Sequence, residues 1–414
     1  MTHPFHLMAK PTSYQCNLAC DYCFYLDKGM GCLPAGRPFR HMEENVLRAY
    51  IQQNIASSPT AEVVFAWQGG EPTLAGLDFY RRALAYQRQY ANGKTIRNTL
   101  QTNGVLLDDA WAAFLAENQF LVGISVDGPQ ALHDKYRKSR AGKSVFQQVI
   151  GAVKRLQHHQ VTFNLLAAVN NETAKAPREI YHFLTRELGA DFLQFIPIVE
   201  RDDQRKRPPL GELIHPQALG QHSITPWSVS GEAYGEFLIA VFDEWVRHDV
   251  GEKFVQLFDC TLAAWVGADP GLCVMQPNCG RALVIEQNGD IYSCDHFVYP
   301  EQRLGNILVD NLAALVDGKQ QTNFGAQKSV LPPDCRQCRY GFACHGGCPK
   351  HRILFKQGGA HNFLCAGYRA YFQHVEPYMN FMAQQLQLRR SPANVMANVG
   401  AIAAAQYPPA PRAG

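Results

Sequence analysis

The sequence predicts an α/β protein in which a parallel sheet is followed by a small cysteine-rich region. Strand-like and helix-like segments alternate over residues 5–200. Thirteen cysteines crowd the two ends of the chain, and positions 33–259 contain none. Alternation of strands and helices at this spacing is typical of parallel sheets with right-handed crossovers.

Apolar or β-branched stretches predict an initial strand near residue 5 and five more at 62–67, 95–101, 121–126, 161–169 and 192–199. Apolar residues at helical spacing predict the helices between them, at 43–55, 77–90, 108–117, 145–158 and 176–188. About six such repeats fit either an open partial barrel or a doubly wound sheet. Periodicity alone does not separate these two folds.

The remaining segments complete the predicted domain organisation. The polar, proline-bearing stretch 201–226 is typical of a linker or surface loop, and helical patterns follow at 231–248 and 253–266. The Ala- and Pro-rich tail is expected to be flexible. We therefore expect a barrel domain at 1–230, a helical linker at 231–270, a cysteine-rich domain at 271–380 and a tail at 381–414.

Composition excludes several classes of protein. A chain of 414 residues suggests two or three domains, and 46% apolar with only 18% charged residues excludes a disordered chain. The net charge of +3 gives no electrostatic reason to expect a nucleic acid or membrane partner. Apolar runs are too short for a bilayer, and the start lacks the pattern of a secretory signal. We expect a cytoplasmic protein.

Three cysteines follow the first predicted strand as Cys16-x3-Cys20-x2-Cys23. Three thiolates can hold three irons of a [4Fe–4S] cluster, and the iron without a protein ligand can then bind a substrate or cofactor. A zinc site with a distant fourth ligand, or unrelated thiols, are the alternatives. Cys32 is a weak candidate for a fourth ligand.

Polar segments follow the next strands in order: Gln68-Gly69-Gly70-Glu71-Pro72, then Gln101 to Gly104, then Ser125 to Gly128 with Arg137 beyond. Each alone is typical of an ordinary turn. Ligand sites of α/β folds lie at such strand ends, where Glu71 is a candidate to oppose an ammonium group.

With the three-cysteine loop, these segments resemble the radical S-adenosylmethionine superfamily, whose fold is a partial (β/α)6 barrel. The resemblance implies that the open iron binds the methionine end of S-adenosylmethionine. It also implies reductive cleavage of this cofactor to a 5′-deoxyadenosyl radical.

The second cysteine region contains eight cysteines that bear on metal binding: Cys273, Cys279, Cys294, Cys335, Cys338, Cys344, Cys348 and Cys365. Four of them have spacings that fit a zinc ribbon, but eight are enough for two fully ligated [4Fe–4S] clusters. Cys32 and Cys260 are left as plain thiols. Residues 284–292 predict a β-hairpin with an Asn288-Gly289 turn, which presents Cys294 and Asp295 at its end.

This region resembles the SPASM extension of radical enzymes that modify peptides. The resemblance, and not the spacing, implies two interleaved ligand sets. One set is Cys273, Cys279, Cys294 and Cys348, and the other is Cys335, Cys338, Cys344 and Cys365.

Residues 5–380 are most similar to the anaerobic sulfatase-maturating enzymes. The match is carried by Cys16 to Leu18, Cys20 to Tyr25, Trp67 to Leu74, Leu121 to Pro129, Cys294-Asp295, Arg303 to Asn306 and Gly346 to Cys348. The family implies oxidation of a cysteine or serine in an unfolded sulfatase to formylglycine (3-oxoalanine). It implies three [4Fe–4S] clusters, S-adenosylmethionine and an electron donor such as flavodoxin or ferredoxin.

Family positions also imply the roles of single residues. The contacts to S-adenosylmethionine fall on Tyr22, Gly70, Ser125, Arg137 and Val199, and the catalytic base falls on Asp295. Tyr25 and Gln68 are weaker candidates to line the pocket.

Two other functions fit part of the pattern. One is a related maturase that forms thioether or carbon–carbon crosslinks in another peptide; such enzymes often carry an N-terminal recognition module, for which a cysteine loop starting at residue 16 leaves no room. The other is a zinc-binding interaction protein, which leaves the polar strand ends unexplained.

Overall fold

The computed structural model describes residues 3–26, 41–202 and 223–406. Its main element is a ten-stranded sheet in the order β12-β11-β10-β1-β2-β3-β4-β5-β6-β9. Six central strands run parallel and follow each other in chain order. They are β1 (His6–Lys10), β2 (Glu62–Trp67), β3 (Thr95–Thr102), β4 (Leu121–Ser125), β5 (Phe163–Val169) and β6 (Phe192–Pro197). The predicted partial barrel is confirmed, because β1 to β6 lie side by side in chain order, whereas a doubly wound sheet reverses its strand order. Among the described strands, β12 and β9 lie at the edges of the sheet.

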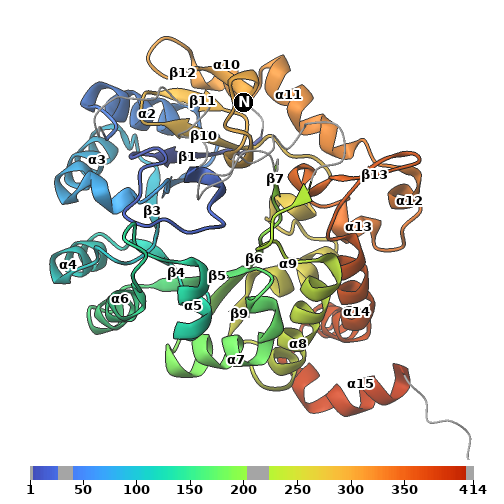
Figure 1. Cartoon of the computed structure of the whole chain (residues 1–414). Coiled ribbons are helices and arrows are strands. Elements are labelled where there is room, and N and C mark those ends of the chain that lie inside the picture. Colours follow the sequence, from blue (N-terminus) through green and yellow to red (C-terminus); the bar gives the residue numbers. More distant parts are fainter. Residues whose placement is uncertain (1–2, 27–40, 203–222, 407–414) are drawn as a thin grey trace, which may run out of the picture.

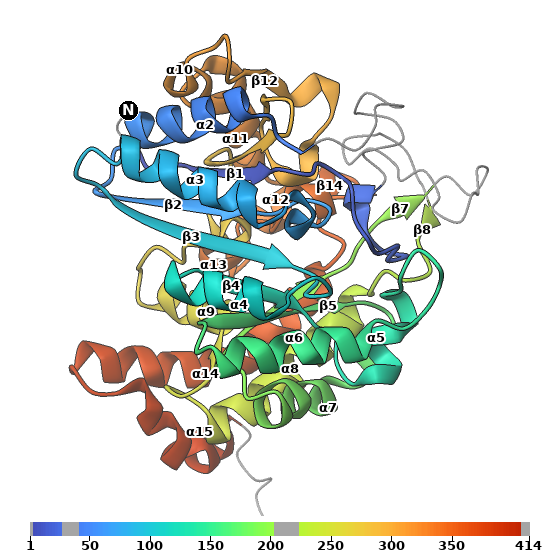
Figure 2. The same cartoon turned by 90° about the vertical axis from the view of Figure 1, so that its left-hand side faces the viewer.

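Helices form an arc outside the curved sheet (Figures 1 and 2). They are α2 (Glu44–Ser57), α3 (Leu77–Tyr90), α4 (Asp109–Glu117), α5 (Gln130–Tyr136), α6 (Phe146–His158) and α7 (Pro177–His182). Apolar residues recur every three or four positions in α6, and Val149, Val153 and Leu156 are accordingly buried. Asp108 begins α4 by accepting a hydrogen bond from the backbone N–H of Trp111. The helices and strands agree closely with the predicted ranges, with two exceptions. No helix is predicted where α5 lies, and the helix predicted at 176–188 consists of α7 and a π-helical segment, Phe183–Glu187.

The sheet extends beyond the barrel at both edges. β9 (Phe254–Val255) pairs in parallel with β6, between α8 (Gly231–His248) and α9 (Gln256–Trp265). At the other edge β10 (Ala282–Glu286) pairs in parallel with β1, and β11 (Asp290–Tyr292) and β12 (Arg303–Asn306) follow in antiparallel order. The Asn288-Gly289 hairpin is as predicted. The segment predicted as a helical linker thus also contributes a strand, and the domain boundaries stay predictions.

Two helices, α8 and α14 (Cys365–Gln387), contact each other at positions where both have glycine. Gly235 of α8 faces Gly367 of α14. A Cβ atom on Gly367 would lie 2.0 Å from the carbonyl oxygen of Gly231, and one on Gly235 would lie 2.6 Å from the Cα of Gly367. The backbones are therefore in direct contact, which packs α14 tightly against α8 (Figure 1).

Apart from α14, which begins at Cys365, the cysteine-rich region consists of short elements. Those near its cysteines are η4 (Cys273–Met275), η5 (Asp295–Phe297), α12 (Pro333–Arg336), α13 (Gly341–Cys344) and η8 (Pro349–His351). Such short helices place several cysteines close together without a large apolar core of their own. Across the described ranges, no helix combines the length and the apolarity that crossing a bilayer requires.

The last segments differ from the prediction of a flexible tail. Residues 392–398 form a 3₁₀ helix in which Val395 is fully buried, and α15 (Val399–Gln406) follows. Alanine is the strongest helix former, so the same composition that suggested disorder also favours a helix. The predicted linker at 201–226 begins and ends in a two-stranded ladder of β7 (Arg201–Asp202) and β8 (Ser223–Ile224), and its residues 203–222 lie outside the described residues.

Candidate functional site

The three-cysteine loop leaves the carboxyl end of β1 and is held by the backbone that follows α5. The N–H of Ala19 donates to the carbonyl of Lys138 at 2.9 Å, and the N–H of Asp21 donates to that of Tyr136 at 3.1 Å. Arg140 Nε adds a 2.8 Å hydrogen bond to the carbonyl of Cys16. The positions of Cys16, Cys20 and Cys23 are thus fixed by a second, distant segment of the chain.

Gly70 fixes the same loop from the end of β2. Its N–H donates to the carbonyl of Ser13 at 2.6 Å, and the N–H of Glu71 donates to that of Gln15 at 2.7 Å. A Cβ atom at position 70 would lie 2.0 Å from the carbonyl oxygen of Gln15. Only glycine permits this approach.

Glu71 is a buried carboxylate whose hydrogen bonds lie at the ends of β2 and β3. Its side chain is fully buried, and its carboxylate accepts hydrogen bonds from the N–H and hydroxyl of Thr73, the hydroxyl of Thr102 and the N–H of Asn103. Three of these hydrogen bonds end on Oε1 and one on Oε2, and a role of Glu71 opposite an ammonium group stays a prediction. Glu71 ties the ends of β2 and β3 together beneath the cysteine loop.

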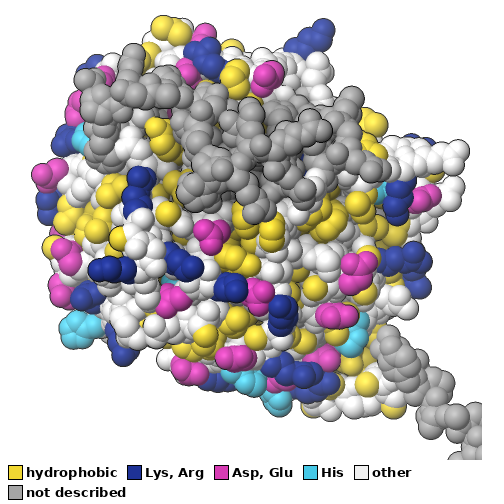
Figure 3. Space-filling model, viewed as in Figure 1, with side chains coloured by type: hydrophobic (Ala, Val, Ile, Leu, Met, Phe, Trp, Pro, Cys, Tyr) yellow, Lys and Arg dark blue, Asp and Glu magenta, His cyan; other side chains and the backbone are white. Residues whose placement is uncertain are grey.

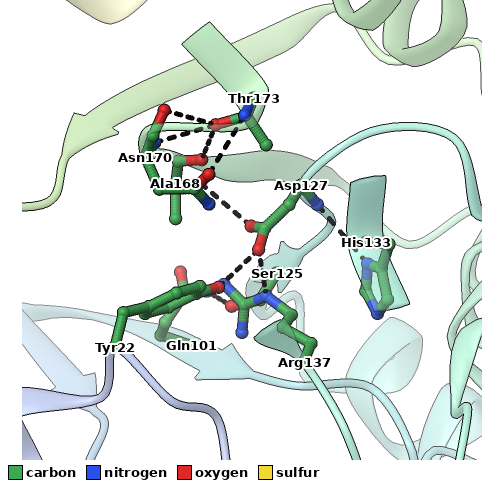
Figure 4. A network of polar contacts seen from close by, with 9 residues as sticks. All are labelled: Tyr22, Gln101, Ser125, Asp127, His133, Arg137, Ala168, Asn170 and Thr173. Atoms are coloured by element: carbon green, nitrogen blue, oxygen red, sulfur yellow. Dashed lines mark hydrogen bonds and ion pairs between the residues drawn. The ribbon is translucent and has the colours of Figure 1, made fainter. Parts of the chain in front are cut away.

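Asp127 brings two predicted cofactor contacts together, although no role for Asp127 is predicted from the sequence. Its carboxylate accepts from the hydroxyl of Tyr22, from Arg137 Nε at 3.0 Å and from the N–H of Ala168 at 2.9 Å (Figure 4). The Arg137 guanidinium also lies 5.4 Å from the centre of the Tyr22 ring. Asp127 itself is 1% exposed. It therefore anchors the cysteine loop to the ends of β4 and β5.

We expect the Asp127→Asn substitution to lower the free energy of unfolding by about 3–5 kcal/mol, because it leaves Arg137 as a buried cation without a counter-charge. Urea unfolding followed by circular dichroism measures this change. Asp109→Asn is the control: Asp109 pairs with Arg155 and His159 but is 76% exposed, so its loss should cost at most about 1 kcal/mol. Equal effects of the two variants would contradict the anchoring role of Asp127.

His133 makes this part of the protein sensitive to acid. Burial lowers its pKa to about 4, whereas an unfolded histidine has a pKa of about 6.5. The unfolded chain then binds more protons than the folded chain between these values, so stability is lost as the pH falls through this window. Between pH 7 and pH 4, we expect the free energy of unfolding of the unmodified protein to fall by about 3 kcal/mol more than that of a His133→Asn variant. Parallel urea titrations across this range test the difference, and identical pH profiles would contradict it.

The other predicted cofactor contacts lie at neighbouring strand ends. The Ser125 hydroxyl accepts from Gln101 Nε2 at 3.3 Å, and Val199, just beyond β6, is buried. Tyr25 and Gln68 lie on either side of β1: the Tyr25 hydroxyl donates to Glu286 of β10, and the N–H of Gln68 donates to the carbonyl of Ala9 at 2.9 Å. The assignment of these residues to S-adenosylmethionine or to the pocket stays a prediction.

The three cysteines of this loop, Cys16, Cys20 and Cys23, lose their protons to become thiolates only if a nearby positive charge stabilises them. Burial raises the pKa of Cys16 to about 12, with the nearby Glu71 adding to the effect, and burial also raises the pKa of Cys20 and Cys23. At neutral pH these thiols keep their protons unless cations bind. Iron ions supply such charge, and binding them releases the protons. A raised pKa is expected of any buried thiol, so the assignment of these three cysteines to a cluster stays a prediction.

The eight remaining candidate ligands fall into two electrostatic neighbourhoods. Burial raises the pKa of Cys294, and Cys348 and Cys273 raise it further; Cys348 in turn is raised by burial, Cys273 and Cys279. In the other group, burial raises the pKa of Cys344, and the nearby Cys365, Cys335 and Cys338 raise the pKa of Cys344 further. These neighbourhoods coincide with the two ligand sets implied by the resemblance, which remain predictions as ligand assignments.

The described residues hold no group of three or more His, Cys, Asp or Glu side chains arranged around a single metal ion. A zinc ion gathers its ligands around one centre, at about 2.3 Å for each sulfur. In an iron–sulfur cube each thiolate binds a different iron, so its sulfurs stand further apart.

Asp295 lies where the two cysteine regions meet. It begins η5 directly after Cys294, and its side chain is 25% exposed. Its Oδ1 lies 2.6 Å from Lys10 Nζ, at the end of β1. Next to it, the ring of His296 lies 5.0 Å from that of Phe24, which follows Cys23. Lys10 was not among the predicted site residues, because its partner lies in the last third of the chain.

Comparisons with known proteins agree with this geometry. The family model of the radical SAM superfamily matches residues 11–184, and that of an iron–sulfur cluster-binding domain, SPASM, matches residues 273–339. The second match replaces the zinc alternative for the cysteine-rich region.

The chain is 44% identical to the serine-type anaerobic sulfatase-maturating enzyme of Bacteroides thetaiotaomicron, over 95% of this chain and 94% of that protein. It is 32% identical to the cysteine-type enzyme of Clostridium novyi, over 93% of this chain and 98% of that protein. The solved structure of native anSMEcpe with bound AdoMet and the Kp18Cys peptide is similar with a TM-score of 0.80 at 30% identity, covering 92% of this chain and 100% of that one. The chain therefore belongs to the anaerobic sulfatase-maturating enzymes, within the radical S-adenosylmethionine superfamily.

Proposed function

We propose that this protein oxidises a serine or cysteine side chain of an unfolded sulfatase polypeptide, in a motif of the Cys/Ser-x-Pro-x-Arg type, to formylglycine. Serine is the expected residue, because the serine-type relative is the more similar of the two types compared (44% against 32% identity). S-Adenosylmethionine and three [4Fe–4S] clusters are the cofactors of this reaction.

One observation carries the proposal: a partly exposed carboxylate, Asp295, lies between the loop of Cys16, Cys20 and Cys23 and the second cysteine region. It is linked to the first through Lys10 and is adjacent to Cys294 of the second. Oxidation of an alcohol to an aldehyde removes two electrons and two protons, so it needs a hydrogen-atom acceptor, a base and an electron acceptor close together. The geometry supports such a site.

The bound cofactors supply the adenosyl radical that removes one hydrogen atom from the β-carbon and an acceptor for one electron. Side chains of this protein carry out proton removal and hold the other groups in place. Asp295 takes the hydroxyl proton of a serine substrate, so that the C=O bond forms as the electron leaves. A cysteine substrate loses its thiol proton in the same way, and water then replaces sulfur, releasing hydrogen sulfide. Asp127 keeps Tyr22 and Arg137 in place during these steps.

The face on which the strands end has the character needed to receive a peptide. Below the residues drawn in grey, hydrophobic side chains are spread across this face, with Lys, Arg, Asp and Glu side chains among them (Figure 3). A segment with a small target residue, a proline and an arginine offers matching apolar and charged groups. This favours an extended peptide over a small polar metabolite.

Mass spectrometry of two sulfatase-derived peptides, one with Ser and one with Cys at the target position, tests the proposal. Each is incubated without oxygen with the reconstituted protein, S-adenosylmethionine and a chemical reductant. We expect an aldehyde at the target residue and a matching amount of 5′-deoxyadenosine. Cofactor cleavage with both peptides unchanged would move the function to another peptide, such as one that receives a thioether or carbon–carbon crosslink.

We also propose a cytoplasmic location and reduction by a small electron-transfer protein of the flavodoxin or ferredoxin type. The cytoplasm keeps thiols reduced, as assembly of these clusters requires. Replacing the chemical reductant by reduced flavodoxin in the same assay tests the proposed electron donor. If no more aldehyde forms with flavodoxin than without any reductant, the proposed donor is contradicted.

A further inference from the structure

Lys10 is a buried cation at the centre of the candidate site. It is the last residue of β1 and is 3% exposed. Its Nζ lies 2.6 Å from Asp295 Oδ1 and 4.3 Å from the centre of the Tyr25 ring. Burying an ammonium group without a counter-charge is strongly unfavourable, so this position requires an acidic partner.

Two carboxylates compete for this cation. Glu286 is the residue of β10 that pairs with Lys10 in the sheet. Burial raises the pKa of Glu286, and of the two nearby charges Lys10 lowers it while Asp295 raises it. The hydroxyl of Tyr25 donates to Glu286 Oε1. Glu286 thus accepts a hydrogen bond from Tyr25, whereas Lys10 forms its short ion pair with Asp295. Asp295 is the more exposed of the two acids.

The ion pair joins two parts of the chain that must be aligned for the reaction. Lys10 precedes the loop of Cys16, Cys20 and Cys23, whereas Asp295 follows Cys294. The main chain of Lys10 is held rigidly, because β1 lies between β2 and β10 in the sheet. η5, by contrast, is a single 3₁₀ turn of three residues, which gives Asp295 little support of its own.

We propose that Lys10 is a positioning residue that holds the carboxylate of Asp295 within hydrogen-bond distance of the substrate hydroxyl or thiol, from which it accepts the proton. This inference rests on the proposed function, since it assigns Asp295 to proton removal. Lys10 binds one carboxylate oxygen and leaves the other for the substrate. Without Lys10 the adenosyl radical still forms, but the substrate radical is not deprotonated in time, and cofactor is consumed without product.

The test compares Lys10→Met with Lys253→Met. Lys253 also forms a 2.6 Å ion pair, with Asp191, and is 14% exposed, but this pair precedes β6 and β9 at the opposite ends of the strands. Iron content, peptide Kd by fluorescence anisotropy, 5′-deoxyadenosine and aldehyde are measured for both. For K10M we expect unchanged iron and peptide Kd, and about 10- to 100-fold less aldehyde per 5′-deoxyadenosine. K253M should match the unmodified protein in every quantity.

A double variant separates positioning from other roles. Because Lys10 acts through Asp295, K10M/D295N should yield no less aldehyde per 5′-deoxyadenosine than D295N alone. An unchanged ratio in K10M, a weakened peptide Kd, or an additive loss in the double variant would each overturn the proposal. If K10M loads less iron than K253M, Lys10→Gln replaces it, because glutamine removes the charge but keeps a hydrogen-bond donor. We then expect a ratio of aldehyde to 5′-deoxyadenosine between those of the unmodified protein and D295N, and an unchanged ratio would contradict the role. Failure of the proposed function itself is distinct, because the unmodified protein would then form no aldehyde.

Discussion

In a Cys20→Ala variant we expect 5′-deoxyadenosine formation to fall to the level measured without iron, while Cys260→Ala keeps the rate of the unmodified protein. Cys20 is buried in the loop that follows β1, and burial keeps its thiol protonated unless iron binds. A cube with only two thiolates from this loop loses its attachment to the chain. Cys260 lies in α9, outside both cysteine neighbourhoods.

Chromatography of 5′-deoxyadenosine and iron analysis measure the two effects together. C20A should lose the iron of one cluster out of three and keep the rest, because the other eight cysteines lie in the separate C-terminal region. Cys260 is a suitable control, since burial raises the pKa of its thiol too, to about 11. Cofactor cleavage by C20A at more than a few per cent of the normal rate would contradict the role of the loop.

Much of the fold could be predicted because the barrel obeys simple periodic rules. Helices such as α6 carry one apolar face, and strands such as β2 are short apolar runs between turn residues. The Asn288-Gly289 turn is a strong local signal for a hairpin. Each of these features depends on neighbours in the sequence, which is why the predicted ranges agree with the structure.

Features that depend on distant partners could not be predicted in the same way. β9 contains only Phe254 and Val255, too few residues to interrupt a helical pattern, and it is a strand because it pairs with β6. The tail is ordered from residue 392 to 406 although its composition suggested disorder, since Val395 is buried. Local composition does not report such packing.

The candidate site shows the same division. The cysteines and the polar strand ends were predictable because spacing and order along the chain reveal them. The roles of Glu71 and Asp127 depend on what each carboxylate contacts: Glu71 accepts hydrogen bonds from Thr73, Thr102 and Asn103, whereas Asp127 holds Tyr22 and Arg137. Lys10 was missed for the same reason. A lysine at a strand end is usually exposed, and only the fold brings Asp295 to it.

An Asp295→Asn variant should separate radical formation from product formation. Asparagine has nearly the same shape but accepts no proton at neutral pH, so the substrate radical lacks its base. We expect aldehyde formation to fall about 10²- to 10⁴-fold, the usual contribution of a positioned general base. Cofactor cleavage should continue, because the loop of Cys16, Cys20 and Cys23 is unchanged. The measured quantity is aldehyde formed per 5′-deoxyadenosine released.

Asp290→Asn is the matched control, since Asp290 lies in the same hairpin and forms a 2.6 Å ion pair with Arg303. Disturbing the hairpin without touching the base should leave the ratio unchanged. If D295N instead lowered 5′-deoxyadenosine and aldehyde equally, Asp295 would act before the radical forms, through Cys294 or cofactor binding. A ratio that falls only in D295N leaves proton removal as the step that fails, because radical formation precedes that step and is intact.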